Sequence, residues 1–312
     1  MADPKQAARR YARASGGSPF PLSERHGAWR VALADGRTVD FTPLTGPIED
    51  DLATRDFSIN AIAERAGTGE SVDPFGGYDD LAARRLRAVK ESVFRDDPLR
   101  LLRALRLEDE LPFDFRIVPE TEELIRRDSG LVTRPSKERT LAELRRLSVD
   151  GFRRLDELGL LEPLGGSLAS VDRAGVAGDP DYDLVVVFRE NLLKLPISNE
   201  TRRFARTLLR AEPPANDSPR AIHRFRRATE PWALEALAFL GARGFDAAVL
   251  RAREEEPKKP LVRGGDLGLA PGPEVGRLLE EIAEERAAGT ITTKEEALDY
   301  ARRSTGSFRS DG

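Results

Sequence analysis

The sequence contains no cysteine and only two histidines among its 312 residues. The absence of cysteine excludes disulfide bonds and thiolate-bound zinc, and it is typical of a protein from a reducing cytoplasm. With so few histidines, a metal ion would have to be bound by carboxylates, which favours Mg²⁺ over zinc. No stretch approaches the roughly 20 apolar residues of a membrane span, and the first residues form no signal peptide, so we expect a cytoplasmic protein without a membrane partner.

The net charge is small, −4, although 33% of the residues are charged. A nucleic-acid partner would therefore have to bind a local basic surface, because the molecule as a whole does not supply one. Local clusters of positive charge occur between residues 84 and 146. They include the stretch RRLR at residues 84–87, residues 95–106, and then Arg126, Arg127, Arg134, Lys137, Arg139, Arg145 and Arg146.

The stretch RDDPLRLLRALR, residues 95–106, places one aspartate and a series of arginines at intervals of three. Positions three apart are neighbours on a helix surface, so we expect these side chains to form one ridge, with the leucines facing elsewhere. The members of this arginine ridge are Asp97, Arg100, Arg103 and Arg106. One interpretation is a solvated helix face with a capping aspartate and Pro98 in the first turn. The other is a surface that binds phosphates and bases.

Residues 28–44 predict a β-hairpin, because two alternating segments flank an Asp35-Gly36 turn signal. In the second strand, Asp40 lies between two apolar residues and must point to the opposite face from them. Asp40 is therefore either an exposed strand aspartate or a carboxylate that binds a metal ion.

Residues 54–64, TRDFSINAIAE, predict the start of a short helix whose apolar side chains are buried. Its polar residues need partners beside a core helix, and they are Arg55, Asp56 and Asn60. Local capping and a salt bridge would satisfy them, and a binding site is the alternative. The next stretch, SVDPFGGYDDL, predicts a strand end, a turn with Asp73 and a helix start.

Capping signals predict helices near both ends of the chain and in its middle. Asp3 precedes a proline at a helix start, and Ser136 opens the stretch SKERTLAELRRL. Towards the C-terminus, Pro273 begins one helix, and Thr293 with Glu296 forms the capping box of another. Strand signals nearly vanish after about residue 84, so we expect the rest of the chain to be helical.

Five stretches occur in the order found in class II tRNA nucleotidyltransferases, the CCA-adding enzymes, and in the related bacterial poly(A) polymerases. They are TRDFSINAIA, VDPFGGYDDLAARRLRAV, FRDDPLRLLRALRL, SKERTLAELRRL and GGDLGLAPGPEVGRLL. The sequence resembles this family over nearly its whole length. The resemblance implies an α+β fold: a truncated nucleotidyltransferase head (residues 1–89), then an all-α neck with a base-reading helix (90–150), a helical body (151–210) and an RNA-binding helical tail (211–312).

By the same resemblance, the protein would add C or A to the 3′ end of a tRNA without a nucleic-acid template, with CTP and ATP as substrates and Mg²⁺ as cofactor. Asp97 and Arg100 would pair with the Watson–Crick edge of the incoming base, because an acceptor beside a fork of donors complements such an edge. The other nucleotide contacts implied are Arg55, Asp56, Asn60, Arg103 and Arg106. The RNA contacts expected in the neck are Arg134, Lys137 and Arg139.

The sequence departs from the family in three places. Asp96 stands where the family usually has glutamate, and Thr54 where it has a second arginine. Family members also begin with a Gly-Gly loop for the triphosphate and an Asp-x-Asp strand for two magnesium ions, and by the resemblance this sequence starts just downstream of both. The resemblance makes Asp40 the third catalytic, metal-binding carboxylate, without its two partners. We therefore expect an incomplete Mg²⁺ site, poor catalysis by the chain as given, and upstream codons that encode the loop and strand.

Other interpretations stay open. The protein could be a poly(A) polymerase, a catalytically silent tRNA-binding remnant, or a helical scaffold. Residues 164–188 contain a Gly-Gly-Ser sequence followed by Asp181-x-Asp183, which superficially resembles the missing loop and strand. Such short matches arise easily in acidic, glycine-rich chains, so we interpret this stretch as an acidic loop that enters a helix.

Overall fold

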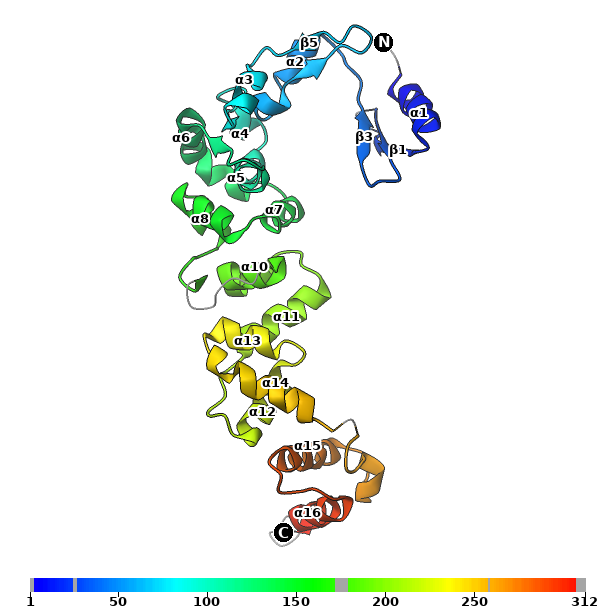
Figure 1. The fold of residues 1–312 in the computed structure, drawn as a ribbon, viewed down its shortest axis with the longest axis vertical. Helices are drawn as coiled ribbons and strands as arrows, with labels where there is room; N and C mark the ends of the chain where they lie inside the picture. Colours follow the sequence, from blue (N-terminus) through cyan, green and yellow to red (C-terminus); the bar gives the residue numbers. More distant parts are fainter. Residues whose placement is uncertain (1–2, 25–26, 172–178, 258, 307–312) are drawn as a thin grey trace. The chain divides into compact units, whose positions relative to one another are not determined.

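The fold is taken from a computed structural model that describes residues 3–24, 27–171, 179–257 and 259–306 (Figure 1). The chain divides into two compact units, residues 1–131 and residues 132–312, and each is described by itself. Within the described ranges, no helix is long and apolar enough to cross a membrane.

The first unit combines short strands with helices, as the α+β prediction requires. Its strands are β1 (Ser18–Ser23), β2 (Ala28–Ala32), β3 (Thr38–Phe41), β4 (Ala63–Glu64), β5 (Ser71–Val72), β6 (Arg85–Leu86) and β7 (Arg116–Ile117). Its helices are α1 (Pro4–Ser15), α2 (Ile48–Leu52), the 3₁₀ turn η1 (Ser58–Asn60), α3 (Gly77–Ala82), α4 (Val93–Asp96), α5 (Arg100–Glu110) and α6 (Pro119–Asp128). The 3₁₀ helix η2 (Ser129–Thr133) spans the boundary between the units.

Helix α1 packs against an antiparallel sheet with strand order β1-β2-β3. The predicted cap is confirmed, because Asp3 Oδ1 accepts a hydrogen bond from the main-chain N–H of Lys5. Ala8 and Ala12 of α1 are buried against Val31 of β2. The predicted hairpin is also confirmed, since β2 and β3 pair in an antiparallel register.

The short helix expected to begin within residues 54–64 is only a single turn. Ser58–Asn60 form a single 3₁₀ turn, and β4 follows shortly after it. At the first residue of the turn, Ser58 donates its main-chain N–H to the carbonyl oxygen of Arg87 at 2.9 Å, as a residue in a strand would. After the turn, β4 pairs with β5. Because strand-like pairing uses the main chain on both sides, one helical turn is all that fits.

The arginine ridge is not one continuous helix. Helix α4 ends at Asp96 and α5 begins at Arg100, and between them Asp97 has an extended conformation with φ −142° and ψ 99°. Pro98 explains the break, because a proline ring disfavours the helical conformation of the preceding residue. Asp97 Oδ1 accepts a hydrogen bond from the N–H of Leu99 at 3.1 Å. The capping aspartate is therefore present, but the placement of Asp97 on the helical ridge is wrong.

Strands also persist slightly beyond the expected head. β6 and β7 form a parallel pair in which Arg85 lies opposite Arg116. β6 belongs to the expected head and β7 to the expected neck, and one compact unit contains both. The division into head, neck, body and tail thus stays a prediction.

The described residues of the second unit form helices and no strands (Figure 1). They are α7 (Lys137–Leu144), α8 (Val149–Glu157), η3 (Glu162–Leu164), α10 (Pro180–Phe188), η4 (Arg189–Lys194), α11 (Asn199–Arg210), α12 (Pro219–Thr229), α13 (Ala233–Leu240), η5 (Arg243–Phe245), α14 (Asp246–Glu255), η6 (Gly264–Leu267), α15 (Pro273–Ala287) and α16 (Lys294–Gly306). This agrees with the helical interpretation of the second half of the chain.

Two of the predicted helix caps lie in this unit, and both are confirmed. Ser136 Oγ accepts the N–H of Arg139 at the start of α7. At the start of α16, Thr293 Oγ1 accepts the N–H of Glu296, whose carboxylate accepts the N–H of Thr293, so the predicted capping box is confirmed. Helix α10 belongs to the core of the unit, because residues 182–188 are all buried.

Candidate functional site

The carboxylate of Asp56 lies at the centre of the candidate site. Its side chain is only 8% exposed. Oδ1 accepts hydrogen bonds from the N–H of Phe57 at 2.9 Å and from the amide of Asn60 at 3.0 Å. Oδ2 lies 2.7 Å from Nε of Arg103 on α5. The structure therefore joins the TRDFSIN motif to the arginine ridge through an ion pair.

Arg100 makes a second connection between the same two segments. Its Nη2 donates to the carbonyl oxygen of Thr54 at 2.6 Å, and its Nη1 donates to that of Arg55 at 3.3 Å. A guanidinium group has five N–H donors, so these contacts do not use all of them. The Arg55 side chain points elsewhere, because its Nη2 lies 2.6 Å from Asp51 Oδ2. The main chain before Asp56 is thus bound to the first turn of α5.

The other two members of the ridge lie in different surroundings. Asp97 precedes α5, and its main-chain carbonyl accepts the N–H of Arg100 at 3.0 Å, so the two residues are adjacent. Arg106 is 8% exposed, and its Nε lies 3.7 Å from Glu110. Asp97, Arg100 and Arg103 are therefore accessible at least in part, and the expectation that Arg106 lies on the same exposed surface is wrong. Hydrophobic packing on both sides of α5 is the reason, since Leu102 and Leu105 are buried as well.

Asp40 forms a bidentate ion pair within the hairpin. Arg30 lies opposite it in the register, and the guanidinium donates to both carboxylate oxygens, at 2.6 and 2.8 Å. This hydrogen bonding holds the pKa of Asp40 below its usual value. No group of three acidic or histidine side chains that could bind a metal ion occurs among the described residues. The donor set present around Asp40 therefore does not fit a Mg²⁺ site.

The three expected RNA contacts lie together along the chain at the start of α7. Arg134, Lys137 and Arg139 are all exposed. Lys137 Nζ donates to the carbonyl oxygen of Lys194 at 3.2 Å. Exposed cations at a helix start are accessible to phosphate groups, and the RNA-binding role of these residues stays a prediction.

The second acidic pattern is part of a helix start. Asp181 lies in the first turn of α10, where its Oδ1 is 2.7 Å from Nη2 of Arg145 and its Oδ2 accepts the hydroxyl of Thr201 at 2.6 Å. Asp183 is 5% exposed. Residues 172–178 of this stretch lie outside the described residues. The interpretation as an acidic segment that enters a helix agrees with the structure.

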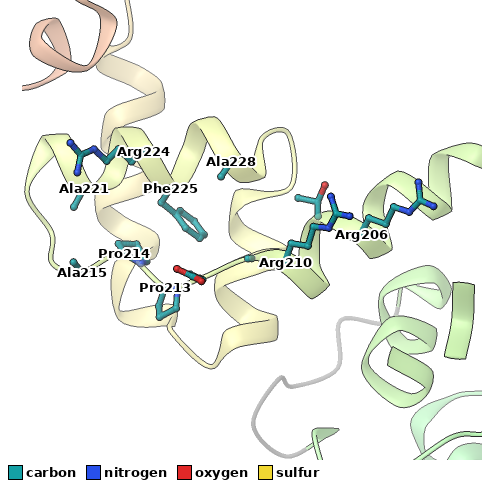
Figure 2. Close-up of a pocket in the computed structure, with 12 residues that line it drawn as sticks. Arg206, Arg210, Pro213, Pro214, Ala215, Ala221, Arg224, Phe225 and Ala228 are labelled. Atoms are coloured by element: carbon teal, nitrogen blue, oxygen red, sulfur yellow. The ribbon is translucent and has the colours of Figure 1, made fainter. Parts of the chain in front are cut away.

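A hollow of about 490 Å³ lies between α11 and α12 in the second unit. Figure 2 shows that Phe225 points into it, whereas Arg206 and Arg224 extend away from it. Arg224 is bound to Glu284 at 2.6 Å. The charged groups around this hollow do not converge, so it has neither the polar groups of a catalytic site nor those of a phosphate site.

Comparison with known proteins shows the family to which the chain belongs. Residues 28–87 match a model described as the poly A polymerase head domain, and residues 114–169 match a probable RNA and SrmB-binding site of polymerase A. The A-adding tRNA nucleotidyltransferase of Deinococcus radiodurans is 32% identical over 96% of this chain and 89% of that relative. The chain therefore belongs to the tRNA nucleotidyltransferase family.

A second relative of this nucleotidyltransferase is the CC-adding enzyme of Thermus thermophilus, which is 30% identical over 96% of this chain and 87% of its own. Solved structures share the fold. The Thermotoga maritima CCA-adding enzyme complexed with tRNA has a TM-score of 0.72 at 23% identity, with 98% of this chain and 85% of that chain covered. The Bacillus stearothermophilus CCA-adding enzyme in complex with CTP has a TM-score of 0.69 at 22% identity, covering 95% and 86%.

Beside the candidate site lies a buried carboxylate that the sequence did not reveal. Asp80 of α3 is 2% exposed and accepts the hydroxyl of Ser58 at 2.7 Å. The stretch GYDDL marks a helix start, but nothing in it distinguishes the buried Asp80 from the exposed Asp79 beside it. A contact between residues 22 positions apart has no periodic signal that could have predicted it.

Proposed function

We propose that this nucleotidyltransferase binds CTP and ATP between the TRDFSIN motif and the first turns of α5, and adds C, A or both to the 3′ end of a tRNA. The observation that carries the proposal is the direct bonding of these two segments through Arg100 and Arg103. Family membership supports the reaction class. A poly(A)-adding activity and a silent RNA-binding protein are the alternatives that the experiment below separates.

The base is read by Asp97 and Arg100 in this proposal. Both residues stand at the entrance to α5, one as an acceptor and the other as a fork of donors. Cytosine and adenine each present an exocyclic amino donor, whereas uracil and guanine present a carbonyl acceptor at the equivalent place. An aspartate beside an arginine therefore complements cytosine and adenine. With uracil or guanine, the aspartate oxygen would face the carbonyl oxygen of the base, so that two acceptors would oppose each other.

The sugar and phosphates are bound by the neighbouring groups. Arg103 is 45% exposed although it is paired with Asp56, so its guanidinium is accessible to a phosphate oxygen. Asn60 is exposed and is oriented by its hydrogen bond to the same carboxylate. Asp56 thus orients one cation and one amide toward the same ligand.

Equilibrium binding of all four nucleotides tests the proposal on the chain as it stands. We expect CTP and ATP to bind more tightly than UTP and GTP. Arg100→Ala should reduce that preference by roughly 1 to 3 kcal/mol, which is the discrimination of a bidentate base contact. Arg126→Ala is the matched control, because Arg126 is an exposed arginine of the same unit whose partner is Glu122. Equal affinity of the unmodified protein for all four nucleotides would contradict the proposal.

A transfer assay separates the alternatives. Incorporation of labelled CTP and ATP is measured on tRNAs that end before the first C, before the final A, and on an unrelated RNA. Addition of a single C, two Cs or one A to tRNA supports the proposed activity, and long A tracts on any RNA favour the poly(A) alternative. Nucleotide and tRNA binding without incorporation would bear out the sequence-based expectation of poor catalysis.

A further inference from the structure

We propose that Asp80 and Ser58 are positioning residues of the nucleotide site: their buried hydrogen bond holds the 3₁₀ turn in the conformation that presents Asp56 and Asn60. This inference rests on the proposed function. It adds that nucleotide affinity depends on Asp80 and Ser58, although neither residue touches the nucleotide.

The contact is short and fully enclosed. Ser58 has no exposed surface and Asp80 is 2% exposed. The Ser58 hydroxyl donates to Asp80 Oδ2 at 2.7 Å. A hydrogen bond to a charged acceptor is among the stronger ones in proteins, and a buried carboxylate that loses a donor keeps its desolvation penalty.

The charge of Asp80 is balanced by two arginines. Arg85 Nε lies 3.1 Å from Oδ1, and Arg87 Nε donates to Oδ2 at 3.1 Å. Both arginines are partly exposed at the surface of the unit, whereas the carboxylate is not. Without Asp80, two guanidinium groups would lie close together with no anion between them. The carboxylate therefore connects α3, the turn and the segment that follows α3.

Main-chain contacts with the same neighbouring segments also restrict the turn. Ser58 donates its N–H to the carbonyl oxygen of Arg87 at 2.9 Å, and Val89 donates to the carbonyl oxygen of Asp56 at 3.1 Å. Gly77, at the start of α3, approaches the turn so closely that a Cβ there would collide with the carbonyl oxygen of Ser58. Both the hydroxyl and the main chain of Ser58 are thus bound to the layer formed by α3 and residues 85–89.

The 3₁₀ turn positions two side chains of the proposed nucleotide site, Asp56 and Asn60. Asp56 lies two residues before Ser58, and Asn60 lies two residues after it. The hydrogen bond from Asn60 to Asp56 at 3.0 Å closes this turn on its outer side, next to Arg103. A rotation of the main chain at Ser58 would therefore separate the amide of Asn60 from the carboxylate of Asp56. The inner contact with Asp80 prevents that rotation without facing the nucleotide.

The experiment uses two variants with a matched control in the full chain. Ser58→Ala removes only the donor, and Asp80→Asn keeps the shape but removes the charge. We expect each to weaken CTP binding about tenfold, which corresponds to about 1.4 kcal/mol, with tRNA binding unchanged. Asp79→Asn is the control, because Asp79 is the exposed neighbour on α3, and its effect should stay below about twofold.

Two further readouts distinguish positioning from general destabilisation. Amide hydrogen exchange should rise in peptides from residues 54–63 and stay unchanged in peptides from residues 28–41. In an Asp56→Asn background, Ser58→Ala should no longer weaken CTP binding appreciably, since the group it positions is altered. A purely structural role would instead raise exchange in both regions and give additive losses in affinity.

The outcomes are separable. Unchanged exchange over residues 54–63 in Ser58→Ala overturns the inference, whatever the nucleotide result, and so does raised exchange with unchanged CTP affinity. If Asp80→Asn does not fold, Ser58→Ala decides alone. Failure of the unmodified protein to bind CTP or ATP overturns the proposed function, and the exchange data then still decide whether Asp80 orders the turn.

Discussion

Removal of Arg103 provides a stringent test of how the two motifs are joined. In Arg103→Ala, Asp56 loses the guanidinium that lies 2.7 Å from its Oδ2. The carboxylate stays buried, because its side chain is 8% exposed, and it keeps the N–H of Phe57 and the amide of Asn60 as donors. The variant therefore leaves a buried, partly satisfied anion.

The expected cost lies between two limits. Loss of one partner from a fully buried ion pair costs about 3–5 kcal/mol, whereas an exposed pair contributes about 0–1 kcal/mol. Arg103 is 45% exposed, so solvent screens the pair and the remaining donors stabilise the anion. We expect a loss of about 1–2 kcal/mol in the free energy of unfolding of the first unit. In an Asp56→Asn background the same substitution should cost less than about 0.5 kcal/mol, which gives a coupling of about 1 kcal/mol.

Urea unfolding followed by tryptophan fluorescence measures this coupling in one unit at a time. The chain has two tryptophans. Trp29 lies in β2 of the first unit and Trp232 in the second. In a Trp232→Phe background, the fluorescence reports on the first unit alone. All four proteins of the cycle are compared in that background.

The control and the refuting result are equally specific. Arg126→Ala, which breaks an exposed pair with Glu122, should change stability by less than about 0.5 kcal/mol and show no coupling to Asp56. A coupling between Arg103 and Asp56 below about 0.3 kcal/mol would mean that the ion pair does not join the motifs. The interpretation of the ridge as a solvated helix face would then be the better one.

Two further predictions concern Asp40 and the basic surface of the second unit. Arg30 lowers the pKa of Asp40 from its ordinary value of 3.8, so the pair stabilises the folded state above that pH and the contribution is lost as the pH falls through the lower, folded-state pKa. Asp40→Asn should therefore cost up to about 1 kcal/mol at pH 7 in urea unfolding, and this cost should shrink as the pH falls below 3.8. Arg134→Ala and Lys137→Ala should each weaken tRNA binding independently of the 3′ sequence and reduce the slope of log K against log salt by about 1, as filter binding over a salt series measures; unchanged slopes would contradict the RNA-binding role.

Local signals in the sequence were sufficient for much of the fold. The Asp3 cap and the Thr293 capping box were predicted correctly because a cap depends on residues within one helical turn of each other. The hairpin followed from a two-residue turn signal and strand alternation. The candidate site residues came from the family resemblance, and the structure brings Asp56, Asn60 and Arg103 together.

The remaining features depend on contacts between distant segments. The 3₁₀ turn replaced the expected helix because main-chain pairing with residues 87–89 constrained it, and no periodicity within residues 54–64 contains that information. Arg106 was expected to be accessible because of its spacing, but its burial depends on which elements pack on both sides of α5. Asp80 was missed for the same reason, since its partners Ser58 and Arg87 lie on different segments.

The break at Pro98 changes how Asp97 and Arg100, the proposed base-reading residues, are positioned. On a continuous helix, Asp97 would lie one turn before Arg100, and the two groups would be held about 5 Å apart by helix geometry. With Asp97 in an extended conformation, its position depends instead on the hydrogen bond to the N–H of Leu99 and on the restriction that Pro98 imposes. Arg100 is oriented separately, by the carbonyl oxygens of Thr54 and Arg55. The two side chains therefore have contacts with different segments, so a shift of the TRDFSIN motif relative to α5 would change the distance between the Asp97 carboxylate and the Arg100 guanidinium.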